Sequence, residues 1–183
     1  MQSIVLVGLK HVGKTSAGVA LARLLGLPCF DVDEEVVRIH EAETGTRRPV
    51  REIYRLLGKE GFQDLERRAA RELAARARLR PCVIATGGGI CDNPGALSAL
   101  KEVGVVVYLQ EEPHILFERI VEGGLPPFLE GPDPWEAFLA LYERRHQAYL
   151  SQAHVVVRAR GTWEDELARS ILAALEEHGY ARK

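Results

Sequence analysis

The fold is decided near the start of the chain, by Ile4-Val-Leu-Val-Gly8-Leu-Lys-His-Val-Gly13-Lys14-Thr15. The apolar first part predicts a buried strand, and the second part matches G-x-x-x-x-G-K-[ST], a phosphate-binding loop that joins a strand to a helix. The two glycines permit backbone angles that point successive N–H groups inward, and the start of the helix adds a positive dipole. A chance match in a glycine-containing turn is the alternative. The strand and the helix at the correct ends argue against it, so the stretch predicts a nucleotide-binding loop.

Each polar residue of this loop has an expected task. In loops of this kind the lysine, here Lys14, reaches the β- and γ-phosphates of ATP, and the Thr15 hydroxyl can ligate Mg²⁺. His11 and Val12 stand where glycine or serine is common. Because the backbone supplies the donors, we expect their bulk to leave the phosphate site open and to alter loop strain and nucleotide affinity. The sequence therefore predicts Mg²⁺ as the cofactor and an ATP site made by Gly8, Gly13, Lys14, Thr15 and Ser16.

Beyond this loop, short apolar runs alternate with longer segments of helical period. Strands are predicted at 28–30, 82–85, 105–109 and 154–157, and helical segments at 15–25, 34–77, 95–103, 113–122, 134–150 and 164–178. This alternation is typical of an α/β fold in which a parallel sheet carries helices on both faces. Residues 122–134 are too rich in glycine and proline for a continuous helix and predict a loop or mobile flap. We expect one domain over residues 1–183.

Composition restricts the partners. The net charge of -2 gives no sequence-independent attraction to nucleic acid, and no stretch approaches the length of a membrane span. The N-terminal apolar run is too short for a signal peptide. Three cysteines without CxxC spacing are typical of reduced thiols in a cytosolic protein. We therefore expect a cytoplasmic protein, a monomer or weak dimer, whose partners are ATP and a small hydroxylated substrate and include neither nucleic acid nor membrane.

An acidic pair follows the second predicted strand, in Phe30-Asp31-Val32-Asp33. Residues i and i+2 of an extended chain face the same side, and parallel strands end at the ligand-binding edge. Asp31 and Asp33 should therefore converge near the γ-phosphate. One carboxylate, assigned to Asp31, suits the Mg²⁺ shell, and Asp33 can accept the proton of an attacking hydroxyl. The alternative for Asp33 is a helix N-cap before Glu34-Glu35, and both roles can hold together.

A triple glycine, Thr86-Gly87-Gly88-Gly89, follows the third predicted strand. Alone it could be a flexible turn, although it also permits close approach of backbone to a ligand. With the phosphate-binding loop, the acidic pair, the segment 58–66 and Arg145-His-Gln-Ala-Tyr149, its order and spacing make nearly the whole chain resemble the shikimate kinase family. The resemblance implies a three-layer α/β/α P-loop kinase fold with a five-stranded parallel sheet of order 2-3-1-4-5. It also implies a substrate-binding helical insert at 34–80 and a lid at 122–134.

The resemblance also assigns site residues. Lys14 and Asp33 would be catalytic, and the guanidinium of Arg119 would lie over the adenine ring. Trp163 falls near the loop that covers the other face of the base, or anchors a helix start. Glu66 matches a position that orients a neighbouring arginine, or is an ordinary helix charge. The acceptor would be bound by Asp33, Gln63, Glu66, Gly87, Gly88, Gly89 and Arg145.

Two family arginines are missing. The family pattern G-E-x-x-F-R ends here in Gln63, and the lid pattern R-P-L-L begins here with Pro126, whereas Arg145 is kept. Because a carboxylate pairs best with a guanidinium, each loss matters: removal of one partner of a desolvated charge pair costs about 2–5 kcal/mol. Six other cations are candidates to replace the missing arginines: Lys10, Arg47, Arg48, Arg51, Arg67 and Arg68. For most of them, an exposed position on a solvated helix face is the better explanation.

Three hypotheses for function follow. The first is an ATP-dependent phosphotransferase with an alcohol acceptor, most simply shikimate, which would become shikimate 3-phosphate in aromatic amino acid biosynthesis. The second is a kinase of the same fold that acts on another hydroxylated acceptor, which the missing arginines favour. The third is a nucleotide- or metabolite-sensing domain without turnover, which the presence of Lys14, Thr15, Asp31 and Asp33 disfavours.

Overall fold

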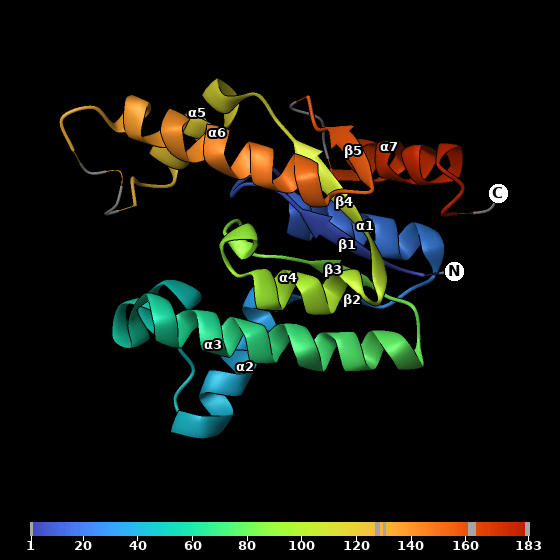
Figure 1. Ribbon diagram of the computed structural model, residues 1–183, viewed down its shortest axis with the longest axis horizontal. Helices are drawn as coiled ribbons and strands as arrows, with labels where there is room; N and C mark the ends of the chain where they lie inside the picture. The colour runs from blue at the N-terminus through green and yellow to red at the C-terminus, as the bar shows by residue number, and fades with distance from the viewer. Residues whose placement is uncertain (1, 127–128, 130, 161–163, 182–183) are drawn as a thin grey trace.

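A single parallel sheet forms the centre of the protein (Figure 1). The computed structural model describes residues 2–126, 129, 131–160 and 164–181. Within these ranges five strands lie in the order β2-β3-β1-β4-β5, all parallel. Their bounds are β1 Ser3–Val7, β2 Cys29–Asp31, β3 Val83–Ala85, β4 Gly104–Gln110 and β5 Val155–Arg158. The predicted strand order is confirmed.

The two central strands carry the apolar sequences that a sheet covered on both faces requires. Every residue of β1 is buried, and so are the first six of β4. Ile4 is paired with Val83 on one side and with Val105 on the other, so that β1 has a partner on both edges. This arrangement explains why the runs contain β-branched residues without polar alternation.

Helices cover both faces of the sheet. α1 packs on α7 behind the sheet in the view of Figure 1, α4 and α6 lie in front of it, and α3 packs on α4 and α2. None of the helices that the structure describes is both long and apolar enough to cross a membrane. The bounds are α1 Lys14–Leu25, α2 Val32–Thr44, α3 Val50–Leu79, α4 Pro94–Lys101, α5 Pro113–Glu122, α6 Pro134–Gln152 and α7 Glu164–Glu177.

Two sequence-based boundaries were wrong. The predicted helical segment 34–77 is two helices, because Gly45 ends α2 with a φ of 71° and Pro49 precedes α3. Gly58 adds a kink inside α3, with φ 68° and ψ -176°. The second strand ends at Asp31, so Asp33 lies in the first turn of α2 and does not share a strand face with Asp31.

The sheet places three of the predicted site segments at one edge. The carboxyl end of β1 leads into the phosphate-binding loop, that of β2 ends at Asp31, and that of β3 leads into Thr86 and the three glycines. Because β3 lies between β2 and β1 and all three strands are parallel, these ends meet at the same edge. The fold therefore builds the site from segments that are far apart in the chain.

Candidate active site

The phosphate-binding loop keeps its shape through three residues with positive φ. Gly8 has φ 146° and Gly13 has φ 96°. A Cβ atom on Gly8 would also meet the Leu109 carbonyl oxygen at 2.5 Å, so only glycine fits there. His11 has φ 65°, an uncommon conformation for a residue with a side chain. The middle of the loop is therefore where the backbone is strained.

Lys14 is prepared for phosphate but already has partners. Its side chain is buried, and Nζ donates to the carbonyl oxygens of Gly8 and Leu9, each at 2.8 Å. Burial lowers the pKa of Lys14 to about 8, and the nearby carboxylates of Asp33 and Asp31 oppose this shift. A bound phosphate would add negative charge beside the ammonium group and favour its charged form.

Asp31 connects the loop to α2. Its Oδ2 accepts a hydrogen bond from the Thr15 hydroxyl at 2.7 Å, and its Oδ1 accepts from the backbone N–H groups of Asp33 at 2.8 Å and Glu34 at 3.4 Å. The N-cap of α2 is thus Asp31, and the alternative that made Asp33 the cap was wrong. The hydroxyl of Thr15 and one carboxylate lie together, as an Mg²⁺ shell completed by phosphate and water requires.

Asp33 lies between the phosphate-binding loop and the triple glycine. A Cβ atom on Gly87 would meet Asp33 Oδ1 at 2.8 Å, and one on Gly88 would meet the backbone nitrogen of Lys10 at 2.6 Å. Both glycines are therefore required for this close approach. Burial and, next, the Asp31 charge raise the pKa of Asp33 to about 6, while Lys14 opposes the shift. A carboxyl group with such a pKa can exchange a proton near neutral pH.

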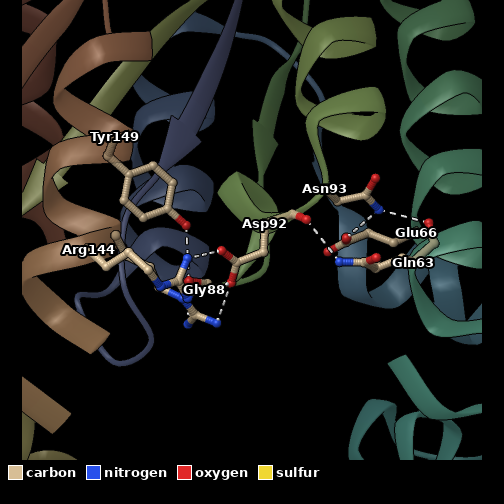
Figure 2. A network of polar contacts seen from close by, with 8 residues as sticks. Gln63, Glu66, Gly88, Asp92, Asn93, Arg144 and Tyr149 are labelled. Carbon is tan, nitrogen blue, oxygen red and sulfur yellow. Dashed lines mark hydrogen bonds and ion pairs between the residues drawn. The ribbon is translucent and has the colours of Figure 1, made fainter. Parts of the chain in front are cut away.

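A second polar network lies beside the glycines, on the side of α3 (Figure 2). The Gln63 amide nitrogen donates to the Asp92 carbonyl oxygen at 2.9 Å. The Asn93 amide donates to the Gln63 carbonyl oxygen at 2.8 Å and to Glu66 Oε2 at 2.9 Å. Burial raises the pKa of Glu66 to about 7, although the hydrogen bond from Asn93 opposes this shift. Gln63 and Glu66 are thus fixed to the segment that follows the glycines.

Arg145 extends from α6 to the same segment. Its Nη1 donates to the Gly88 carbonyl oxygen at 3.0 Å, and its Nε and Nη2 donate to Asp92 Oδ2 at 3.1 and 2.9 Å. The Tyr149 hydroxyl also donates to Gly88, at 3.0 Å. Arg144, the preceding residue, contacts both carboxylate oxygens of Asp92. One carboxylate therefore holds two arginines.

Two cavities adjoin at the phosphate-binding loop, and His11, Gly13, Ser16 and Glu164 line both of them. The larger, about 630 Å³, brings Lys14, Thr15 and Asp33 together with Gly87 and Gly88. The smaller, about 490 Å³, lies toward α5 and is lined by His11, Val12, Gly13, Ser16, Arg119, Glu122, Gly123, Glu164 and Leu167. The pair offers one space for phosphates and a neighbouring one for the rest of a nucleotide.

Arg119 is held at the smaller cavity from two directions. Its Nη1 donates to the His11 carbonyl oxygen at 2.9 Å, and its Nη2 lies 3.8 Å from Glu111 Oε2. Glu111 is buried, and its carbonyl oxygen accepts a hydrogen bond from the Tyr142 hydroxyl at 2.9 Å. The planar guanidinium thus has a defined place beside the strained part of the loop.

Of the six cations considered as substitutes for the missing arginines, Lys10 lines the larger cavity. Four others pair with carboxylates and are partly exposed: Arg47 with Glu34 and Glu41, Arg48 with Glu52, Arg67 with Asp64, and Arg68 with Glu43. Arg67 and Arg68 lie on the face of α3, whereas Arg47 and Arg48 lie in the loop between α2 and α3, where no helix face was available.

The predicted lid is described at 122–126, at 129 and from 131 onward, and its mobility stays a prediction. Pro127, Phe128, Glu130 and Trp163 lie outside the described residues.

Sequence reasoning missed Asp92 and Asn93. Both follow the triple glycine within five residues, but no local pattern connects them with Arg145 or Glu66, which lie 53 and 27 positions away in the chain. Proximity to the glycine turn was the available signal. No group of three or more His, Cys, Asp or Glu side chains with the geometry of a metal site occurs among the residues that the structure describes.

Comparisons with known proteins agree with one another. Residues 10–176 match the family described as shikimate kinase. A shikimate kinase of Burkholderia thailandensis is 39% identical over 181 residues, which cover 99% of this chain and 94% of that protein. A solved shikimate kinase from Acinetobacter baumannii, in complex with shikimate, has a TM-score of 0.84 at 29% identity, over 99% of this chain and 96% of that one. The solved shikimate kinase from Aquifex aeolicus has a TM-score of 0.74 at 28% identity, over 98% of this chain and 99% of that one.

Proposed function

Because the chain belongs to the shikimate kinase family, we propose that it transfers the γ-phosphoryl group of ATP to a hydroxyl group of shikimate. The observation that carries this proposal is the larger cavity, in which Lys14 and Asp33 line one space with Gly87 and Gly88. A lysine for phosphate and a carboxyl group for a hydroxyl proton are the two groups that such a transfer needs from side chains. The relative from Acinetobacter baumannii was solved with shikimate bound.

The chemistry divides between the two sides of the cavity. Backbone N–H groups of the loop and Lys14 bind the phosphates and stabilise charge that develops on them. Asp33 accepts the proton of the attacking hydroxyl and orients its oxygen toward the phosphorus atom. The attacking oxygen forms a bond to phosphorus while the bond to the bridging oxygen of ADP breaks. The buried position of Asp33 against Gly87 supports its role as the base.

Mg²⁺ is the proposed cofactor, held by the Thr15 hydroxyl and Asp31. The 2.7 Å contact between the two side chains supports this assignment, since both oxygens are ligands that Mg²⁺ prefers. Because these two residues supply few ligands, phosphate oxygens and water would complete the shell. When bound, the ion offsets negative charge on the phosphates.

We assign acceptor binding to the segment between the triple glycine and α6. Arg145 is the proposed cation for the carboxylate of the acceptor, and Gln63 and Glu66 are proposed partners of its hydroxyl groups. Their hydrogen bonds to the segment 88–93 support this assignment, because they fix the side chains before a ligand arrives. Arg119 is proposed to stack on the adenine ring from the smaller cavity.

For the setting, we infer one functional unit over residues 1–183 in the cytoplasm, as a monomer or weak dimer. Residues 34–80 serve as the acceptor-binding insert, and residues 122–134 close over the nucleotide as a lid. The unpaired state of all three cysteines is consistent with a reducing compartment. Amide hydrogen exchange with and without ATP tests the lid, since equal protection in both states would exclude closure.

A coupled assay of ADP release tests the function directly. The purified protein is given ATP and Mg²⁺ with shikimate, beside a panel of cyclic polyols and hydroxy acids. We expect turnover with shikimate and its loss in Lys14→Ala, since the phosphates lose their main side-chain partner. Lys101→Ala, which removes a lysine paired with Gln152, is the matched control and should be unchanged. No turnover of shikimate beside turnover of another compound would overturn the proposed acceptor.

A further inference from the structure

The cation proposed for the acceptor already has a carboxylate partner. Asp92 Oδ2 accepts hydrogen bonds from Nε and Nη2 of Arg145, two adjacent donors that a carboxylate could otherwise bind in a bidentate fork. Nη1, on the other side, donates to Gly88. The side chains of Asp92 and Arg145 are 23% and 19% exposed, so water screens this pair less than it screens a surface pair.

We propose that Asp92 sets the charge selectivity of the acceptor site, so that neutral hydroxylated compounds are accepted about as readily as hydroxylated carboxylates. This inference rests on the proposed function and concerns the same site. A carboxylate that approaches Arg145 competes with Asp92 for the same donors and meets its negative charge. A neutral compound binds by hydroxyl groups and avoids both costs.

The neighbours of Asp92 strengthen the effect. Gln63 stands where the family carries an arginine, and its amide nitrogen donates to the Asp92 carbonyl oxygen. A neutral amide therefore takes the place of a guanidinium cation. Glu66 lies close by and adds a further carboxyl group. The lid position that carries an arginine in the family is Pro126, which has no charge. The two lysines of the larger cavity, Lys10 and Lys14, lie at the phosphate-binding loop, so we assign them to the phosphates and not to the carboxylate of the acceptor.

Arg144 acts in the opposite direction. It contacts both oxygens of Asp92, and its side chain is 57% exposed, so it draws part of the Asp92 charge away from Arg145 and toward solvent. The three side chains together carry a net charge of about +1 when all are ionised. Removal of Asp92 should therefore raise the attraction for a carboxylate, and removal of Arg144 should lower it.

The experiment compares shikimate with its methyl ester, which keeps the ring hydroxyls and lacks the charge. KM and kcat are measured for both compounds with the wild type, Asp92→Asn and Arg144→Gln. Asp64→Asn removes an equal charge from an exposed pair with Arg67 and serves as the control. Calorimetry with ADP present gives the two affinities independently of turnover.

We expect the wild type to bind the two compounds within about threefold of each other. Asp92→Asn should tighten the binding of shikimate about tenfold, since one charge-assisted contact becomes available, and should change the affinity for the ester much less. Arg144→Gln should weaken the binding of shikimate and leave the binding of the ester unchanged. Because this variant replaces an exposed side chain, it stays informative even if Asp92→Asn does not fold.

Three outcomes would overturn the inference. The first is a wild type that binds shikimate about a hundredfold or more tighter than the ester. The others are an Asp92→Asn variant whose affinities for the two compounds change equally, or one whose affinity for shikimate changes no more than that of Asp64→Asn. The proposed function fails separately, when the wild type does not phosphorylate shikimate. In that case the calorimetric ratio of shikimate to ester still tests Asp92.

Discussion

Asp33 lies directly against Gly87: a Cβ atom at Gly87 would meet Asp33 Oδ1 at 2.8 Å, closer than a real methyl group comes to a carboxylate oxygen. The proposed base is thus positioned by the absence of a side chain on the neighbouring strand end. The base and the triple glycine form one structural unit, although 54 positions separate Asp33 from Gly87 in the sequence.

Gly87→Ala should reduce kcat by about tenfold or more and leave ATP affinity nearly intact. The added methyl group displaces the Asp33 carboxylate, and a small misplacement of a catalytic group is costly. Gly18→Ala is the control, because its Cβ would meet its nearest neighbours at an ordinary 3.4 Å. Steady-state kinetics and nucleotide binding measure both effects. An unchanged kcat in Gly87→Ala would mean that Asp33 is not the base.

Asp33→Asn should lower kcat by about 10²-fold or more, because proton transfer to a positioned base contributes roughly that much. ATP affinity should stay close to that of the wild type, whereas Asp31→Asn should weaken Mg²⁺-dependent ATP binding. If Asp33→Asn weakened ATP binding as strongly as turnover, Asp33 would belong to the metal site.

The pH profile gives a second test of Asp33. Its pKa is raised to about 6, and a base must be ionised to accept a proton. Because this pKa belongs to the protein without substrate, the kcat/KM of the wild type should fall as the pH decreases through about 6, which a profile from pH 5 to 8 would record. A kcat/KM that is flat between pH 5 and 7 would contradict the assignment.

Glu66→Gln should remove a pH dependence of stability. The folded state holds the pKa of Glu66 at about 7, above its ordinary 4.5, so between these values the folded protein binds more protons than the unfolded chain. The free energy of unfolding therefore falls as the pH rises from about 4.5 to 7, by about 2–3 kcal/mol from this residue. Glutamine still accepts the hydrogen bond from Asn93 and does not ionise.

Urea unfolding at pH 5 and pH 8 measures the difference. We expect the loss of stability between the two pH values to be smaller in Glu66→Gln than in the wild type. Glu60→Gln, on the exposed face of α3, is the control and should retain the full loss. Equal losses in the wild type and Glu66→Gln would mean that Glu66 is ionised throughout.

Gln63→Arg should strengthen the binding of shikimate by about 1–3 kcal/mol, because a guanidinium beside Glu66 can bind the carboxylate of the acceptor. Pro126→Arg should instead raise kcat more than affinity, because the matching position in the family faces the phosphoryl group during transfer. Kinetics of the single variants and of the double variant distinguish the two effects. If the wild type turns shikimate over at ordinary rates and neither change helps, Arg145 supplies the needed charge alone.

Local sequence predicted the phosphate-binding loop, a parallel sheet and the positions of most helices, whereas the strand order was predicted from the resemblance to the family. Gly8 and Gly13 must adopt positive φ, and a run such as Ile4–Val7 without polar residues is stable only inside a sheet covered on both faces. Asp33 was wrongly predicted to share a strand face with Asp31, although it lines the larger cavity together with Lys14. The capping hydrogen bonds of Asp31 start a helix where an extended chain was expected.

The partners of the acceptor site were decided only by tertiary structure. Asp92 meets Arg145 because the segment after β3 packs beside α6, and Asn93 meets Glu66 because the same segment packs on α3. Local propensities give no information about such contacts, since a hydrogen bond between side chains 53 or 27 positions apart depends on how whole helices pack. The sequence by itself predicted which residues bind phosphate, and packing alone decided that Arg145 is paired with Asp92.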